Sequence, residues 1–166
     1  MQQAAQTGAA VREEDRNAIV ALINEAAAYA DEQRFIDWLD LFVDQGDYAA
    51  ITHENLNASG LYLFYDTGKS RIQERAAYLI GIWQVPRGRT LHLVSNIVVS
   101  ADADPGVLHA KSNFIITRTA ESEHSKLHAC GQYRDTFEQS GNRWLFRSRH
   151  VIVDSNLLPN SFTDLL

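Results

Sequence analysis

The chain has 166 residues, of which 45% are hydrophobic and 22% are charged, and its formal net charge is −6. This length and composition are typical of one globular domain and exclude a disordered chain. The acidic balance argues against nucleic acid or an anionic membrane as the main partner, because phosphate binding needs clustered Lys and Arg.

The N-terminal part predicts a flexible tail and two helices. Residues 1–12 carry no basic region followed by an apolar core, so we expect a flexible tail and not a secretory signal. Apolar residues recur at helical spacing over residues 12–30 and again over residues 35–42. We expect these two amphipathic helices to pack face to face as a lid.

A pair of strands and a third helix follow. Residues 48–54 and 61–65 have strand character, and the turn-rich sequence NLNASG lies between them. Residues 70–83 place apolar side chains on one helical face and charged side chains on the other. The next residues, 84–89, contain proline and glycine and predict a loop.

The second half of the chain predicts four long strands, at residues 91–101, 107–119, 127–139 and 143–154. Strands of this length belong to strongly curved antiparallel sheets. The tail at residues 155–166 ends in apolar residues, which we expect to dock on the sheet or on a partner. Because no repeat or linker divides residues 13–166, we predict one α+β domain with three helices packed on a bent sheet.

The sequence RTLHLVSNIVV, at residues 89–99, places polar groups in an otherwise apolar strand. Side chains alternate between the two faces of a strand, and both faces are apolar enough here to be covered. A buried imidazole or amide without a hydrogen-bond partner costs about 1–3 kcal/mol. We therefore expect His92 and Asn96 to be hydrogen-bond anchors, and we expect this strand, with Arg89 and Ser95, to present an interface.

The last strand, RWLFRSRHVIVD, carries three arginines that regular alternation places on one face: Arg143, Arg147 and Arg149. Asp135 or Glu138 of the preceding strand could lie opposite them, which would make this a charged, exposed face. Alternatively, the arginines belong to a subunit interface, where Arg is enriched and pairs with carboxylates. Asp154, at the end of this strand, is a further interface candidate.

The residue inventory excludes several kinds of catalytic centre. A single cysteine, Cys130, permits no intrachain disulfide and favours a reducing cytoplasm. It also cannot complete an iron–sulfur cluster or a multi-thiolate zinc site. The histidines form no HExxH, and GxGxxG, GxxxxGK[ST] and GxSxG are absent. We therefore assign no metal-binding or cofactor-binding residue.

One catalytic alternative stays open at this point. A curved sheet closed by helices would enclose a cone-shaped pocket, which His92, His150, Tyr65 and Asp154 could line as general acid–base groups. The chain would then be a stand-alone dehydratase or isomerase, or a protein of the same fold that binds a ligand. A histidine in an apolar strand is more often a hydrogen-bonded core residue, so we assign no catalytic residue.

Four segments of the chain resemble one known family. They are the helix pair ending in RFIDWLDLF, the helix IQERAAYL preceded by Asp66, the strand RTLHLVSNIVV, and the pair GQYRDTF and NRWLFRSRHVIVD. Together they are similar to the small (β) subunit of Rieske non-haem iron aromatic-ring-hydroxylating dioxygenases, in the nuclear-transport-factor-2-like (NTF2-like) superfamily. The segments span most of residues 15–156. Leu91 stands where the family commonly has Arg, and WQVPRGRT replaces its acidic double-proline loop.

The resemblance implies a cystatin-like, NTF2-like αβ cone and a non-catalytic, structural role in aromatic catabolism. It implies no cofactor on this chain, because the Rieske [2Fe–2S] cluster and the mononuclear iron would belong to the large (α) subunit. The implied partners are that large subunit and further copies of this chain, as a trimer within a cytoplasmic hetero-hexamer. The candidate structural and interface residues are His92, Ser95, Asn96, Arg89, Asp135, Arg147, Arg149 and Asp154.

Overall fold

Helices form on the predicted amphipathic segments. The computed structural model describes residues 10–82, 88–158 and 165–166. Its α-helices are α1 (Glu13–Asp31), α2 (Phe35–Leu39), α3 (His53–Ala58) and α4 (Lys69–Ala77), and α4 continues into a π-helical segment at Tyr78–Ile82. Ile19 and Ile23 of α1 and Ile72 of α4 are fully buried, as the apolar faces of amphipathic helices require.

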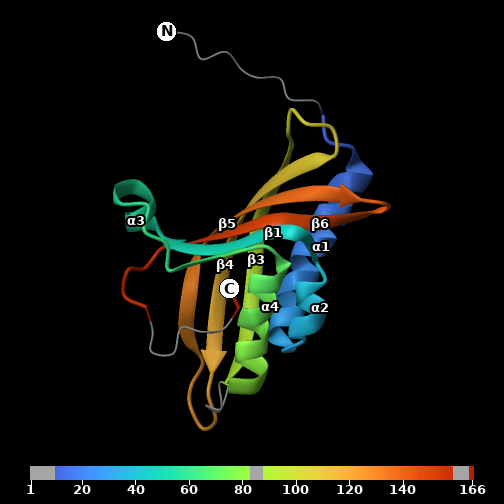
Figure 1. The fold of residues 1–166 in the computed structure, drawn as a ribbon. Coiled ribbons are helices and arrows are strands. Elements are labelled where there is room, and N and C mark those ends of the chain that lie inside the picture. The colour runs from blue at the N-terminus through green and yellow to red at the C-terminus, as the bar shows by residue number, and fades with distance from the viewer. Residues whose placement is uncertain (1–9, 83–87, 159–164) are drawn as a thin grey trace.

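The strands form one curved sheet of six strands in the order β2-β1-β6-β5-β4-β3 (Figure 1). They are β1 (Phe42–Thr52), β2 (Phe64–Thr67), β3 (Arg89–Ala101), β4 (Val107–Thr119), β5 (Lys126–Ser140) and β6 (Arg143–Val153). Neighbouring strands are antiparallel except β1 and β6, which run parallel. The predicted α+β layout on a mostly antiparallel sheet is confirmed.

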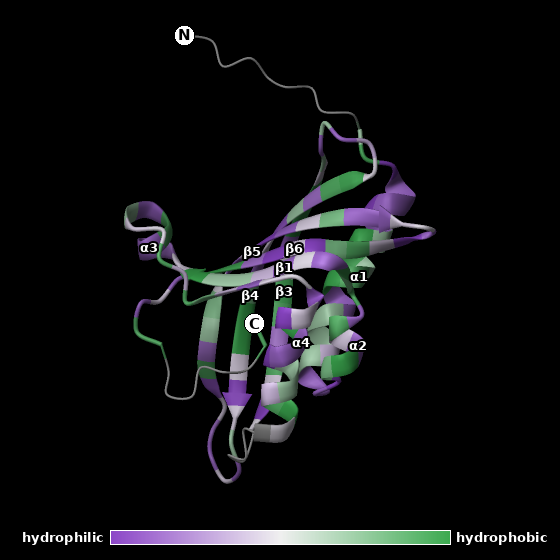
Figure 2. Ribbon diagram, viewed as in Figure 1, coloured by the Kyte–Doolittle hydropathy of each residue, from purple (hydrophilic) through white to green (hydrophobic). Residues whose placement is uncertain are grey.

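The core lies between the sheet and three helices. Figure 1 shows α1, α2 and α4 side by side against one face of the sheet, while α3 projects from its far end. Phe114, Tyr133, Phe137 and Phe146 of the three central strands are buried against this helical layer. Hydrophobic and hydrophilic residues alternate along the strands (Figure 2), because successive side chains point to opposite faces. We call the face away from the helices the outer face.

Two predictions in the first half of the chain are wrong. The sequence predicted helix up to residue 42 and a strand from residue 48, whereas β1 begins at Phe42. The backbone N–H of Phe146 donates to Leu41 O at 2.8 Å, so pairing with the last strand extends β1 toward the N-terminus. In addition, part of the expected turn between the strands is the helix α3, whose first turn is capped by the Thr52 hydroxyl.

A β-bulge divides β3 into two halves. The pairing with β4 shifts between Ser95 and Val98, and Asn96 has a φ of 53°. Alternation is therefore reset: His92 faces the helices before the bulge, and Val99 does so after it. The expectation that Asn96 is a buried anchor is wrong, because its side chain is exposed and bonds to no described residue.

Several predictions fall partly outside the described residues. The residues concerned are 1–9 of the expected tail, the end of the helix predicted at 70–83 together with residues 84–87 of the loop predicted at 84–89, and residues 159–164 of the C-terminal segment. Val11 packs against the core, as do Leu165 and Leu166 at the other end of the sequence. The division into a tail and one domain from residue 13 stays a prediction.

Because of the bulge, the stability of the fold should depend on the residue type at position 96. Replacing Asn96 with Val should cost about 1–2 kcal/mol of unfolding free energy, because a β-branched side chain is strained at a positive φ. Asn96→Gly should change stability by less than about 0.5 kcal/mol, because glycine adopts this conformation freely. Urea denaturation of the three proteins tests this, and equal stability of the Val and Gly variants would contradict the bulge.

Candidate functional site

His92 joins the sheet to the first helix. Its side chain is buried, and its Nδ1 lies 2.6 Å from Asp31 Oδ1 at the end of α1. The backbone N–H of His92 donates to the other carboxylate oxygen of Asp31 at 2.9 Å. Burial opposes the charge of Asp31, but these hydrogen bonds from His92 outweigh it and hold the pKa of the carboxyl below its ordinary value.

The other ring nitrogen of His92 faces the end of the sequence. Nε2 lies 3.3 Å from Leu165 O. The hydroxyl of Tyr48 accepts a hydrogen bond from Leu166 N at 2.9 Å and lies 3.4 Å from Leu166 O. Leu165 and Leu166 are only 2% and 3% exposed. These contacts place the two leucines in the interior of the cone, between the sheet and the helices.

Asp135 and Arg149 form an ion pair on the core face. The residues are directly opposite each other on β5 and β6, and two guanidinium nitrogens donate to the two carboxylate oxygens at 3.1 Å each. The side chains are 0% and 3% exposed. Burial raises the pKa of Asp135, and the facing guanidinium opposes that shift. The guanidinium lies 4.3 Å from the ring centroid of Tyr133 and 4.5 Å from that of Phe146.

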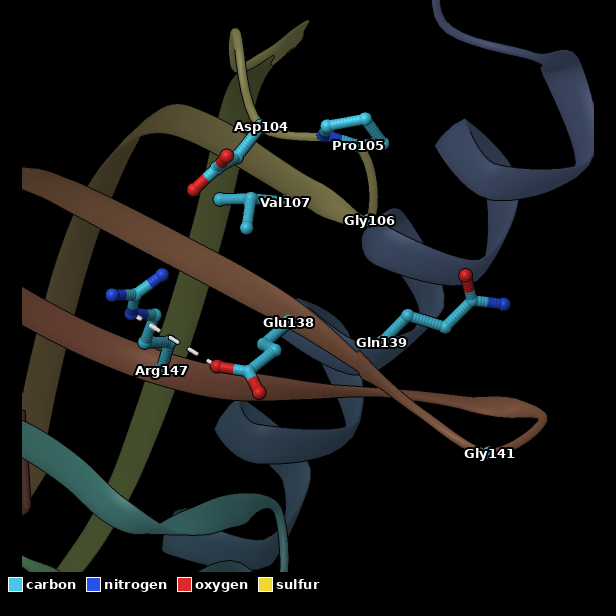
Figure 3. Close-up of a pocket in the computed structure, with 8 residues that line it drawn as sticks. All are labelled: Asp104, Pro105, Gly106, Val107, Glu138, Gln139, Gly141 and Arg147. Carbon is cyan, nitrogen blue, oxygen red and sulfur yellow. Dashed lines mark ion pairs between the residues drawn. The ribbon is translucent and has the colours of Figure 1, made fainter.

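The prediction that the three arginines of the last strand share one face is wrong. The pairing of β5 and β6 shifts after Thr136, so Arg147 is an extra residue in β6. Arg149 therefore points into the core, while Arg143 and Arg147 are exposed. Arg147 Nε lies 3.9 Å from Glu138 Oε2, and both side chains line an open hollow at the strand ends (Figure 3). An exposed pair of this kind contributes about 0–1 kcal/mol.

The structure does not bring together the four side chains of the catalytic alternative. His92 lies inside the cone, against α1. Tyr65 and His150 lie on the outer face with ring centroids 5.7 Å apart. Asp154 is exposed beyond the end of β6, with a carboxylate oxygen 4.0 Å from Cys130 Sγ. The prediction of a shared acid–base pocket is therefore wrong.

The outer face carries an apolar strip that the sequence did not predict as exposed. Its members are 52%, 53%, 45% and 64% exposed, and in chain order they are Leu91, Leu93, Ile115 and Leu127. Leu93 is opposite Ile115, and Thr117 is opposite both Leu91 and Leu127, so the strip is continuous across β3, β4 and β5. The expectation that both faces of residues 89–99 are covered is wrong for the chain by itself.

The remaining interface candidates lie close to this strip. Arg89 is exposed at the start of β3, two residues before Leu91 and on the same face. Ser95 is also exposed and is opposite Asn113 of β4. The structure thus places His92, Asp135 and Arg149 in the interior and Arg89 and Ser95 beside the apolar strip. Three candidates are exposed elsewhere: Asn96 at the bulge of β3, Arg147 at the hollow and Asp154 beyond the end of β6.

The described residues contain neither a metal-binding cluster nor a membrane-spanning helix. Among residues 10–82, 88–158 and 165–166, no group of three or more His, Cys, Asp or Glu side chains could hold a metal ion. Within the same residues, no helix is both long and apolar enough to cross a membrane.

Comparisons with known proteins point to one family. The sequence model of the family described as "Ring hydroxylating beta subunit" matches residues 25–160. The beta subunit of 3-phenylpropionate/cinnamic acid dioxygenase from Photorhabdus laumondii is 28% identical over 145 residues, which cover 79% of this chain and 79% of that protein.

Solved structures agree on the fold. The beta subunit of benzoate 1,2-dioxygenase from Burkholderia mallei superposes with a TM-score of 0.73 at 17% identity, covering 94% of this chain and 99% of that chain. An NTF2-like protein with a cystatin-like fold from Novosphingobium aromaticivorans superposes with a TM-score of 0.66 at 22% identity, covering 87% and 84% of the two chains. The predicted NTF2-like, cystatin-like cone is confirmed.

The contact between Asp31 and His92 should make stability depend on pH. Because the pKa of Asp31 is lowered by folding, the charged carboxyl stabilises the fold above its ordinary pKa of about 4, and this contribution is lost as the pH falls through the lower folded value. Asp31→Asn should cost about 1–2 kcal/mol at pH 7. Denaturant unfolding at pH 7 and pH 3 should show the difference between variant and parent shrinking in acid, and a constant difference would contradict the assignment.

The buried ion pair should be far more sensitive to substitution than the exposed one. Asp135→Ala should cost about 3–5 kcal/mol, because it leaves the Arg149 guanidinium buried without its partner. Arg147→Met, the matched control on the same strand, should cost less than about 1 kcal/mol. Equal losses for the two variants in chemical denaturation would show that the Asp135 contact is not the stabilising one.

Proposed function

The chain belongs to the family of ring-hydroxylating beta subunits, and we propose that it is the non-catalytic, structural small subunit of a multicomponent Rieske aromatic-ring-hydroxylating dioxygenase. The observation that carries the proposal is the family match, which runs from α1 past the end of β6. The chain is thus a subunit of an oxidoreductase and acts in the breakdown of aromatic compounds. The family resemblance of the four sequence segments is confirmed.

In this proposal the redox centres belong to the large (α) subunit. A Rieske cluster is held by two Cys and two His, and the whole sequence has one Cys, so this chain does not supply the ligand set. The chemistry of oxygen activation takes place on the partner, at its iron. The small subunit supplies a rigid surface, since its interior is filled by aromatic side chains and by the buried ion pair.

The apolar strip is the proposed contact with the large subunit. Interfaces have an apolar core and a polar rim, and here four exposed apolar side chains are bordered by Arg89, Ser95 and Asn113. The strip lies on the opposite side of the sheet from the helices, on strands that the core holds rigidly. Binding there would cover apolar surface without rearranging the fold.

The assembly in this proposal is a hetero-hexamer of three large and three small subunits in the cytoplasm. Its support is the family membership, and a reducing compartment is consistent with a single cysteine. Light scattering of the purified complex checks the stoichiometry, and the proposal expects the summed mass of three large and three small subunits.

Co-expression with a Rieske-type large subunit tests the function and the surface separately. Leu93→Glu should reduce the recovered large subunit about tenfold. Burying an unpaired carboxylate in the contact is costly, and a loss of about 1.4 kcal/mol of binding free energy lowers affinity by a factor of ten. Ile36→Glu is the matched control, since Ile36 is 57% exposed but lies on α2.

The two possible failures of this experiment differ. If the parent chain neither co-purifies with a Rieske protein nor affects its yield or activity, the proposed function is wrong. If the parent and both variants co-purify equally well, the function stands and the apolar strip is not the contact.

A further inference from the structure

Two buried polar atoms on the outer face have no hydrogen-bond partner among the described residues. They are Asp47 Oδ1, on β1, and His150 Nε2, on β6. Asp47 is opposite Ser148, which lies two residues before His150 and on the same face, so the two side chains lie over neighbouring strands. A buried carboxylate oxygen without a partner is costly, and in native proteins such groups are paired or bind a ligand or water.

Aromatic rings surround these two atoms. The Tyr65 hydroxyl donates to the other carboxylate oxygen of Asp47 at 3.4 Å. The ring centroids of Tyr62 and Tyr65 lie 4.9 Å apart, and they lie 6.3 Å and 5.7 Å from the imidazole of His150. Tyr65 is 45% exposed, so the group is open to solvent. A carboxylate beside the faces of aromatic rings attracts a cation.

Elsewhere in the chain, the same combination of a carboxylate and aromatic rings holds an arginine. Arg75 pairs with Asp66, and its guanidinium lies 3.7 Å from the ring centroid of Phe64. Arg149 is held in the same way by the buried ion pair described above and by the two aromatic rings beside it. Around Asp47 the carboxylate and the rings are present, and no described residue pairs with the free carboxylate oxygen.

A guanidinium fits these groups better than an ammonium does. Burial lowers the pKa of His150, so its imidazole is neutral at pH 7 and Nε2 can accept a hydrogen bond. Asp47 Oδ1 is the second acceptor, and a planar guanidinium can donate to both while it stacks on a tyrosine ring. Arg134, opposite His150 on β5, carries a like charge, but its Nε donates to Gln132 on its own strand.

We propose that Asp47, Tyr65 and His150 form a binding site for the guanidinium group of an arginine on a partner polypeptide. The site is shallow, so an arginine that belongs to a larger contact is favoured over a free cation by the effective concentration that the neighbouring contacts provide. The site lies over β1, β2 and β6, whereas the apolar strip lies over β3, β4 and β5. The inference therefore does not rest on the proposed function.

The test uses the full chain and two probes of the same shape. Methylguanidinium carries the charge, and N-methylurea is its neutral isostere. Titration is followed by the NMR signals of the Tyr65 and His150 rings, and sodium chloride at the same concentration controls for ionic strength. The acetylated tripeptide amide Gly-Arg-Gly then presents the same guanidinium on a polypeptide.

Methylguanidinium and the tripeptide should bind saturably, and N-methylurea should not. Asp47→Asn should weaken both charged probes about tenfold, because it removes the charge and keeps the shape. Asp44→Asn is the matched control, at an exposed carboxylate on the same strand, and should leave binding unchanged. Tyr65→Leu should also weaken binding, since it removes an aromatic ring and leaves the carboxylate in place.

The contrary outcomes separate the parts of the inference. A folded parent chain that binds neither charged probe saturably overturns it, and so does unchanged binding to Asp47→Asn. Equal binding of N-methylurea overturns the ligand class. Binding of methylguanidinium without the tripeptide overturns the assignment to a partner polypeptide and indicates a site for a free cation. If Asp47→Asn does not fold, as judged by circular dichroism, Tyr65→Leu decides by the same comparison.

Discussion

The ion pair between Asp135 and Arg149 is the constraint on which the rest of the sheet depends. A carboxylate and a guanidinium without access to water are tolerated only as partners, so β5 and β6 have one acceptable register. That register places Tyr133 and Phe146 on either side of the guanidinium. The aromatic core of the cone is therefore built around a charged centre, which fixes strand pairing more strictly than apolar packing does.

The contact between His92 and Asp31 fixes the position of β3, the strand at the end of the sheet. It attaches β3, at the end of the sheet, to the end of α1, so the helical layer and the sheet are held at a fixed angle. Because side chains alternate along the strand, the apolar side chains between these inward residues point outward and are exposed in the described structure. The interior contact and the exposed apolar strip are thus two sides of one strand.

Local patterns were sufficient for the long elements and insufficient where strands depart from regularity. The periodicity of α1, the four long strands and an acidic partner for an arginine of the last strand were all read from residue spacing. The bulges at Asn96 and Arg147 were not, because alternation assumes an unbroken strand and each bulge reverses which residues face the core. The pairing of β1 with β6 and the contact of Leu166 with Tyr48 join residues that are far apart in the sequence. A pattern read over a short stretch of sequence therefore cannot predict them.

The position of β3 in the sheet has a consequence for how the protein is made. It is a 13-residue strand at the end of the sheet, with one edge that pairs with no other described strand and with exposed leucines on its outer face. Such an edge can pair with a strand of another chain. The β-bulge at Asn96 breaks the regular hydrogen-bonding pattern of the edge and so opposes this pairing. In the proposed assembly, copies synthesised in excess of the large subunit would leave this surface uncovered and would therefore be the ones at risk of aggregation.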